Sequence, residues 1–248
     1  MNTEDTNLVI LMKETWDSVA ELMASLPSED WLLPTDCPGW TVKDCFAHLI
    51  GIEQRLLGHS VPSITLTNED LTHTKNELGI ENQVDVVLRR LNPTKELIAE
   101  YKFLTSERLD ILDQSDSLTR KRKAPDGRTV NERELISIRI LDCWVHEQDI
   151  RRAIGRPGNL SGSTATHVFS RLNKTLPFIL GKKVKLKNGC TAQFVIQGDY
   201  AEIISIGNLV EGIKEKDIVY YDKHAGHSIY WKDNTYEVIK AQDIVLVE

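Results

Sequence analysis

Residues 135–155 read LISIRILDCWVHEQDIRRAIG, and the architecture of the first half of the chain follows from this segment. Its core-facing positions recur at spacings of three and four, which is typical of a helix that turns one face towards other helices. These positions are Leu135, Ile138, Asp142, Val145, Asp149 and Arg152. His146 lies beside them, four residues after Asp142, so a carboxylate and an imidazole share one side of the helix. Because an unpaired carboxylate is costly to bury, Asp142 requires a partner in the folded protein.

The predicted helix starts at Thr129, where Glu132 three residues later resembles a capping box, and it ends at Gly155. Three more helical regions precede it in the sequence. They are predicted at residues 7–26, at residues 41–57 between a Thr41–Asp44 capping box and Gly58, and at residues 84–113 with a break or kink at Asn92–Pro93. Residues 60–80 are predicted as loop and residues 120–128, RKRKAPDGR, as a solvated basic turn. Helices joined in this way most simply pack as a four-helix bundle.

A second histidine is also predicted to point into this bundle. His48 shares a face of the helix at 41–57 with Cys45 and Ile52. With Asp142 and His146 it would form a cluster of two imidazoles and one carboxylate, which suits a metal ion with open coordination positions. A network of hydrogen-bonded core histidines explains the same spacing, and the pattern alone leaves both interpretations open.

The stretch GRPGNLSGS at residues 155–163 is rich in Gly, Pro and Ser and is typical of a linker. After about residue 183 the apolar residues alternate or form short β-branched blocks, as in strands. We therefore predict an α+β fold with two domains, residues 1–158 and 164–248. The second domain is predicted to contain a helix at 164–180, strands at 183–187, 191–197, 202–206, 217–221 and 228–231, a short helix at 234–241 and a last strand at 244–247.

Composition excludes several classes of protein. The 248 residues include 41% hydrophobic residues, enough for a core, and the formal net charge of −7 argues against nucleic acid as the partner. No apolar run approaches the roughly 18 residues of a membrane span. The first residues, MNTEDTNLV, do not resemble a secretory signal, and the four cysteines form no CxxC pair. We therefore expect a cytoplasmic protein with reduced thiols and no membrane partner.

Two segments, CPGWTVKDCFAHL at 37–49 and LDCWVHEQDIRRAIGRPG at 141–158, resemble the mycothiol-dependent maleylpyruvate isomerase family. The resemblance covers residues from about 7 to 158. It implies a DinB-like metal-binding four-helix bundle followed by a small α/β domain of the sterol-carrier type. It also implies that His48, Asp142 and His146 are the ligands of a divalent metal, with zinc as the default.

The resemblance further implies the chemistry of this site. A low-molecular-weight thiol, mycothiol or a related one, would bind beside the metal, lose its proton and attack a small electrophile, giving isomerisation or S-transfer. The expected partners are therefore a small thiol and a small electrophilic substrate. Asp149 is expected to accept an imidazole N–H or to pair with Arg152. Cys45 and Cys143 flank the site and could be further ligands or inert core thiols, of which we expect inert thiols.

Two features depart from the family pattern. The isomerases carry glutamate where this chain has Asp142, which is one methylene shorter. The family also has an arginine in its C-terminal domain that helps to bind the substrate carboxylate, whereas no arginine follows Arg171 here. Lysine lacks the bidentate fork of arginine, so we do not expect maleylpyruvate itself to be the substrate. A non-catalytic metal- or ligand-binding protein and a metal-assisted hydrolase remain alternatives, and the sequence does not specify an oligomeric state.

Overall fold

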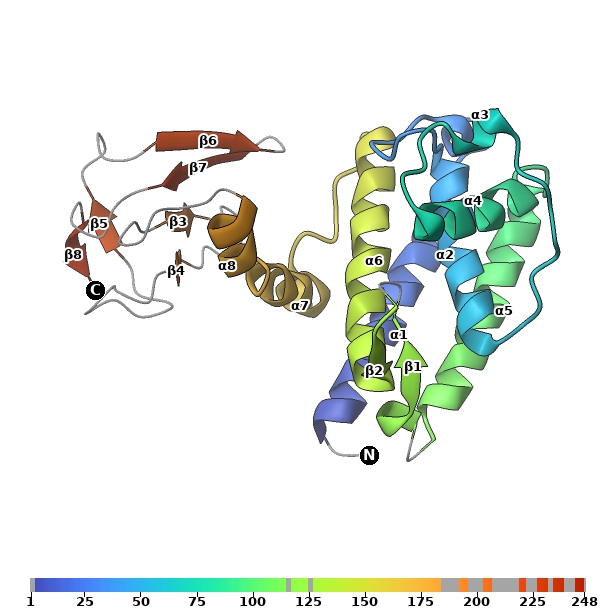
Figure 1. Ribbon diagram of the computed structural model, residues 1–248, viewed down its shortest axis with the longest axis horizontal. Coiled ribbons are helices and arrows are strands. Elements are labelled where there is room, and N and C mark those ends of the chain that lie inside the picture. The colour runs from blue at the N-terminus through green and yellow to red at the C-terminus, as the bar shows by residue number, and fades with distance from the viewer. Residues whose placement is uncertain are drawn as a thin grey trace. The chain divides into compact units, whose positions relative to one another are not determined.

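The computed structural model describes residues 3–114, 117–124 and 127–183, together with strand segments at 192–195, 203–206, 219–221, 227–231, 234–238 and 244–247. It divides into two compact units, Met1–Asn159 and Leu160–Glu248 (Figure 1). The first unit is mainly helical, and the described part of the second unit combines helices with β-strands. The predicted α+β class is therefore confirmed. No helix among the described residues is both long and apolar enough to cross a membrane.

Four long helices form the frame of the first unit. They are α1 (Thr3–Ser25), α2 (Val42–Leu57), α5 (Thr94–Leu112) and α6 (Glu132–Ala153). Both α1 and α2 pack against α5 and α6, so the interior is enclosed on all sides (Figure 1). Fully buried apolar side chains from all four helices fill it, among them Met12, Phe46, Leu49, Leu97, Tyr101, Ile136 and Ile140.

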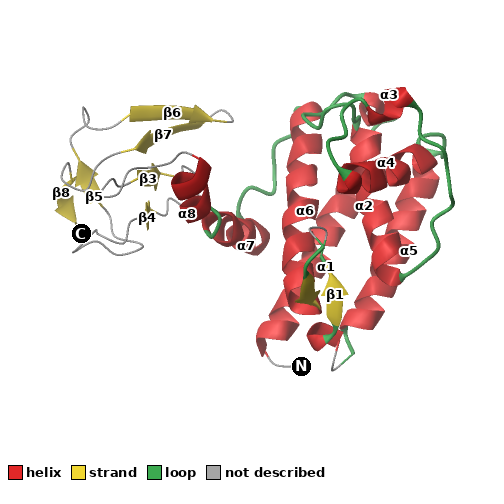
Figure 2. Cartoon of the chain, viewed as in Figure 1, coloured by secondary structure: helices red, strands yellow, loops and turns green. Residues whose placement is uncertain are grey.

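Shorter elements cover this frame. Helix α4 (Glu77–Arg89) packs against α2, and α3 (Asn68–Leu71) packs against α4. A short 3-10 helix, η1 (Asp30–Leu32), contacts α2, and a second, η2 (Ser117–Thr119), contacts α5 and α6. The strands β1 (Lys121–Lys123) and β2 (Thr129–Asn131) form an antiparallel hairpin that contacts α6 (Figure 2).

Several helix ends lie where the sequence predicts them. The Thr41 side chain accepts the Asp44 N–H while the Asp44 carboxylate accepts the Thr41 N–H, which confirms the capping box of α2. Gly58 ends that helix in the left-handed conformation, with φ of 79°. The predicted break at Asn92–Pro93 is confirmed, because α4 ends at Arg89 and α5 begins at Thr94.

Three predictions in the first unit are wrong. Helix α6 does not start at Thr129, because Thr129 pairs with Lys123 in the hairpin and Asn131 caps the helix instead, accepting the Glu134 N–H. For the same reason the basic segment at 120–128 contributes a strand rather than only a turn. The segment at 60–80 is not all loop, because α3 starts at a capping box formed by Thr67 and Asp70 and α4 starts after the cap Asn76.

The second unit begins with α7 (Gly162–Asn173), α8 (Leu176–Phe178) and a π-helical segment, η3 (Ile179–Lys183). The described strand segments after residue 183 form three antiparallel pairs: β3 (Ala192–Val195) with β4 (Ile203–Ile206), β5 (Val219–Tyr221) with β8 (Ile244–Val247), and β6 (His227–Trp231) with β7 (Asn234–Val238). The helix predicted at 234–241 is wrong, because NTYEV is rich in β-formers and pairs with the neighbouring strand. The strand predicted at 183–187 lies, apart from Lys183, outside the described residues.

Gly51 marks the close approach of α2 and α4. A Cβ atom added at Gly51 would overlap Cβ and Cγ of Asp85, which is fully buried on α4. Glycine to alanine within a helix ordinarily stabilises it by about 1 kcal/mol. Here we expect Gly51→Ala to lower the free energy of unfolding by about 1–3 kcal/mol, measured by urea denaturation, because the crowded site cannot expand freely.

Gly79→Ala is the matched control for this prediction. Gly79 is also helical, but an added Cβ would meet its nearest atoms only at 3.5 Å or more. We expect this variant to be as stable as the parent or slightly more stable. Equal stability changes in the two variants would contradict the proposed packing of α2 against α4.

Asp85 makes the stability of the first unit depend on pH. Burial raises the pKa of its carboxyl to about 6, although the Arg55 and Arg89 guanidinium groups oppose the change. A carboxyl with a raised pKa stabilises the fold fully below its unfolded value of 3.8, and this contribution is lost as the pH rises through about 6. Asp85→Asn removes this titration at constant shape. We expect its free energy of unfolding, relative to the parent, to increase by about 2–3 kcal/mol between about pH 4 and pH 7.

Denaturant unfolding of both proteins across this pH range measures the difference. Asp110→Asn, which removes an exposed carboxyl from α5, corrects for the general loss of one negative charge. If the difference in free energy of unfolding between Asp85→Asn and the parent does not change with pH, the prediction is wrong.

Candidate metal centre

The structure brings together the three residues that the sequence predicts as metal ligands. His48 lies on α2, and Asp142 and His146 lie one turn apart on α6. Nε2 of His48 is 3.5 Å from Oδ2 of Asp142, and Nε2 of His146 is 3.8 Å from Oδ1 of the same carboxylate. The two imidazole rings meet edge to face with centroids 4.8 Å apart. One atom from each residue thus lies within 4.8 Å of the other two.

These distances suit a common divalent ion. Nitrogen and oxygen ligands at bond lengths of about 2.0–2.1 Å around a tetrahedral metal are about 3.4 Å apart. Imidazole and carboxylate are ligands that zinc and other first-row divalent metals accept. Nε2 is the nitrogen of His48 that faces Asp142, and its buried Nδ1 has no hydrogen-bond partner among the described residues. The donor set therefore fits a metal.

A tight turn places the Trp40 ring beside both imidazoles. The backbone N–H of Trp40 donates to the Cys37 carbonyl at 3.0 Å, with Pro38 and Gly39 at the centre of the turn. Gly39 has φ of 77°, as the third position of a type II turn requires. The Trp40 ring centroid lies 5.1 Å from that of His48 and 5.9 Å from that of His146.

The two histidines have opposite electrostatic surroundings. Burial lowers the pKa of His48 to about 4, and this outweighs the nearby Asp142 carboxylate, so the ring is neutral at pH 7. Burial also disfavours charge on His146, but Asp149, Cys37 and Asp142 outweigh it and raise the pKa of His146 to about 10. His48 is therefore ready to bind a cation at neutral pH, whereas His146 must first lose a proton.

Arg139 holds the carboxylate of the cluster, and the sequence reasoning did not single it out. It is buried on α6 and donates to Oδ2 of Asp142, and also to Oε1 of Glu53 at 3.0 Å. Burial disfavours an ionised Asp142, but the Arg139 guanidinium and both imidazoles keep the pKa of Asp142 well below its usual range. The spacing of three residues between Arg139 and Asp142 could have predicted this ion pair from the sequence. The Asp142 side chain remains 32% exposed, so the cluster is open to solvent there.

Asp149 lies beside both of the groups that the sequence analysis considered for it. Its Oδ2 lies 3.4 Å from Nδ1 of His146, and its Oδ1 accepts from Arg152. Arg152 also donates to Asp36 at 2.6 Å. Asp149 thus supports the imidazole on the side away from Asp142, as an outer-shell carboxylate does in metal sites.

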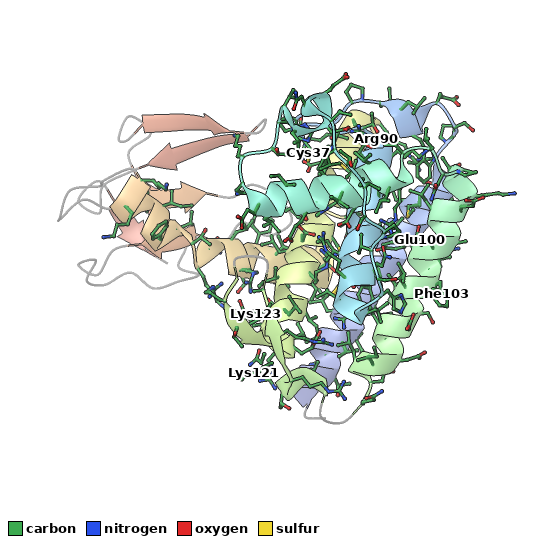
Figure 3. The ribbon with its side chains drawn as sticks, turned by 45° about the vertical axis from the view of Figure 1, so that its right-hand side comes forward. Cys37, Arg90, Glu100, Phe103, Lys121 and Lys123 are labelled. Carbon is green, nitrogen blue, oxygen red and sulfur yellow. The ribbon has the colours of Figure 1, made fainter. Side chains whose placement is uncertain are left out.

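Cys45 and Cys143, the cysteines considered from sequence, are both buried, and a third cysteine lies beside the cluster. Cys37, which is labelled in Figure 3, has no predicted role. Its thiol donates to Oδ2 of Asp149 at 3.2 Å and lies 3.7 Å from Nδ1 of His146. The Cys45 thiol, which hydrogen-bonds to it, and His146 together lower the pKa of Cys37 to about 6 against the effect of burial. Cys143 is buried and accepts from Arg139 at 3.4 Å, and burial raises its pKa. The side chains beyond residue 183, where the family's substrate arginine is expected, lie outside the described residues.

Residues 12–151, which include all three predicted ligands, match the family model of the mycothiol maleylpyruvate isomerase N-terminal domain. The chain belongs to this family. Two uncharacterized proteins of Mycobacterium tuberculosis, from strains H37Rv and CDC 1551, are each 24% identical to it over 141 residues, which make up 56% of this chain and 53% of each relative. The chain thus spans about half the length of these curated relatives.

Solved structures of this family share the fold. The crystal structure of the mycothiol-dependent maleylpyruvate isomerase matches with a TM-score of 0.51, and that of a histidine-to-alanine mutant of it matches with 0.53. Each comparison covers 75% of both chains at 14% identity. The family resemblance predicted from the two motif segments is confirmed.

Two arginines of α6 offer a matched test of how the cluster is held. Arg139 is buried and pairs with Asp142 and Glu53, whereas Arg152 is 37% exposed and pairs with Asp149 and Asp36. We expect Arg139→Leu to lower the free energy of unfolding by about 3–5 kcal/mol, because it leaves Glu53 buried with a lost partner. Arg152→Leu should cost no more than about 1 kcal/mol, as an exposed ion pair does. Chemical denaturation of both variants measures the free energy of unfolding. An equal decrease in the two variants would show that burial does not determine the strength of these ion pairs.

Proposed function

We propose that this protein is a metal-dependent enzyme that uses a low-molecular-weight thiol, mycothiol or a close relative, as a nucleophile towards a small electrophile. The reaction is an isomerisation or a stable S-transfer. The observation that carries this proposal is the convergence of His48, Asp142 and His146 within the segment that matches the family. The names of the family and of its solved members support mycothiol as the thiol.

In this proposal the three residues hold a divalent cation, with zinc as the default, inside a DinB-like four-helix bundle. A bound cation supplies positive charge that favours the thiolate form of a neighbouring thiol at neutral pH. Three protein ligands leave at least one position for that thiol. The solvent-exposed part of Asp142 provides the side from which small molecules approach.

The residues around the ligands prepare them for this role. Burial keeps His48 neutral, and Arg139 keeps Asp142 ionised and oriented. The Asp149 carboxylate, 3.4 Å from Nδ1 of His146, favours the proton on that nitrogen, which leaves the lone pair of Nε2 directed towards the cluster. The Trp40 ring shields both imidazoles on one side, which strengthens electrostatic interactions there.

The electrophile in this proposal is a small molecule other than maleylpyruvate. A bidentate clamp for the substrate carboxylate needs arginine, and no arginine follows Arg171 in the sequence. The substrate is therefore one that the thiolate can attack without such a clamp.

The test is a thiol-dependent rate with a chlorinated nitroarene, in which the thiolate forms a C–S bond and displaces chloride. We expect the metal-loaded parent to accelerate this reaction with mycothiol. Removal of the metal by a chelator should abolish the rate, and added zinc should restore it. His48→Ala and Asp142→Ala should each lower the rate by at least about 100-fold, since each removes a ligand rather than an outer-shell partner. His59→Ala, which removes an exposed histidine paired with Glu107, should retain the rate of the parent.

Three outcomes would contradict this proposal. A rate that survives complete metal removal excludes the proposed mechanism. Hydrolysis of ester or amide substrates without thiol would favour a metal-assisted hydrolase. Full metal content without acceleration of any thiol reaction would favour a metal- or ligand-binding protein.

A further inference from the structure

His146 faces a second group of possible ligands through its other ring nitrogen. Its Nε2 is directed to Asp142, while its Nδ1 lies 3.7 Å from Sγ of Cys37 and 3.4 Å from Oδ2 of Asp149. Sγ of Cys37 is in turn 3.2 Å from that carboxylate oxygen. The thiols of Cys37 and Cys45 and one nitrogen of His146 all lie within 4.8 Å of one another.

These separations match a sulfur-containing tetrahedral site. With metal–sulfur bonds of about 2.3 Å and metal–nitrogen bonds of about 2.0–2.1 Å, adjacent sulfur and nitrogen ligands lie about 3.6 Å apart. Oδ1 of Asp149 accepts a hydrogen bond from Arg152. Its Oδ2 lies near Cys37 and His146, and it would bind the ion together with these two residues. Two thiols and one imidazole thus lie close together, and the Asp149 carboxylate lies beside two of these groups, Cys37 and His146.

The backbone holds these groups in place before any ion binds. Cys37 belongs to the turn closed by the Trp40 N–H, and its own N–H donates to Oγ1 of Thr35 at 3.2 Å. Cys45 is fully buried on α2, where its thiol contacts the same Thr35 hydroxyl at 3.6 Å. Cys37 is partly exposed, so an ion can reach the group from solvent.

We propose that Cys37, Cys45, Nδ1 of His146 and Oδ2 of Asp149 form a second metal site that binds soft divalent ions such as Cd²⁺ and Zn²⁺. Thiolate ligands favour soft metals, whereas the His48–Asp142–His146 cluster offers only nitrogen and oxygen. Both cysteines would bind the ion as thiolates. This inference does not depend on the proposed enzymatic function.

The two sites compete for one imidazole. A neutral imidazole has one lone pair in the ring plane and one N–H, so it binds a metal through one nitrogen at a time. An ion among the cysteines holds Nδ1 and leaves an Nε2–H facing Asp142, while an ion at the first cluster leaves an Nδ1–H facing Asp149. A soft metal at the second site therefore removes one ligand from the first.

Cadmium titration of the full-length, reduced and metal-free protein tests the second site, with thiolate-to-cadmium charge transfer in the ultraviolet as the signal. A Cys190→Ser background removes the thiol that lies outside the described residues. We expect the band to saturate at about one ion per chain. Cys37→Ser and Cys45→Ser should each weaken cadmium binding at least tenfold.

Two controls separate this site from the first cluster and from folding defects. Cys143→Ser changes another buried thiol, one that contacts Arg139 rather than His146, and it should keep the full band. His48→Ala removes a ligand of the first cluster alone and should also keep it. If Cys45→Ser does not fold, the partly exposed Cys37 still provides the test. Absence of the band in the parent, or an undiminished band in Cys37→Ser, overturns the proposal.

Discussion

The buried carboxylate of Glu53 is the interaction on which the first unit depends, because all four long helices meet at it. Glu53 lies on α2, and its Oε1 accepts from Arg139 of α6 and, at 3.3 Å, from the Trp16 indole of α1. Arg108 of α5 approaches Oε2 at 3.4 Å. A charge in an apolar interior is tolerated only when it is paired, so the helices must adopt the arrangement that brings these partners together.

The same ion pair extends directly to the candidate metal centre. Arg139 contacts Glu53 on one side and Asp142 on the other, so the group that joins α2 to α6 also orients a predicted ligand. His48 lies little more than one turn before Glu53 on α2. The cluster is thus built on rigid helices rather than on loops, and the ion pair sets the separation of the two helices that carry its ligands.

His146 lies at the boundary between two chemically different surroundings. One nitrogen faces the Asp142 carboxylate and the His48 imidazole, and the other faces the Cys37 thiol and the Asp149 carboxylate. Trp40 and Cys37 come from the two ends of one turn, so this short segment shapes both sides of the imidazole. Any change in that turn therefore affects both surroundings together.

Local features of the chain could be predicted from the sequence because they depend on residues close together along it. The capping box of α2, the break at Pro93 and the shared face of Asp142 and His146 all follow from interactions within a few residues. The tertiary structure alone determined the start of α6 after a hairpin, the strand at Asn234–Val238, and the approach of Cys37 to His146 across 109 residues. Local periodicity contains no information on such contacts, since they form only when the packing of distant segments outweighs local preference.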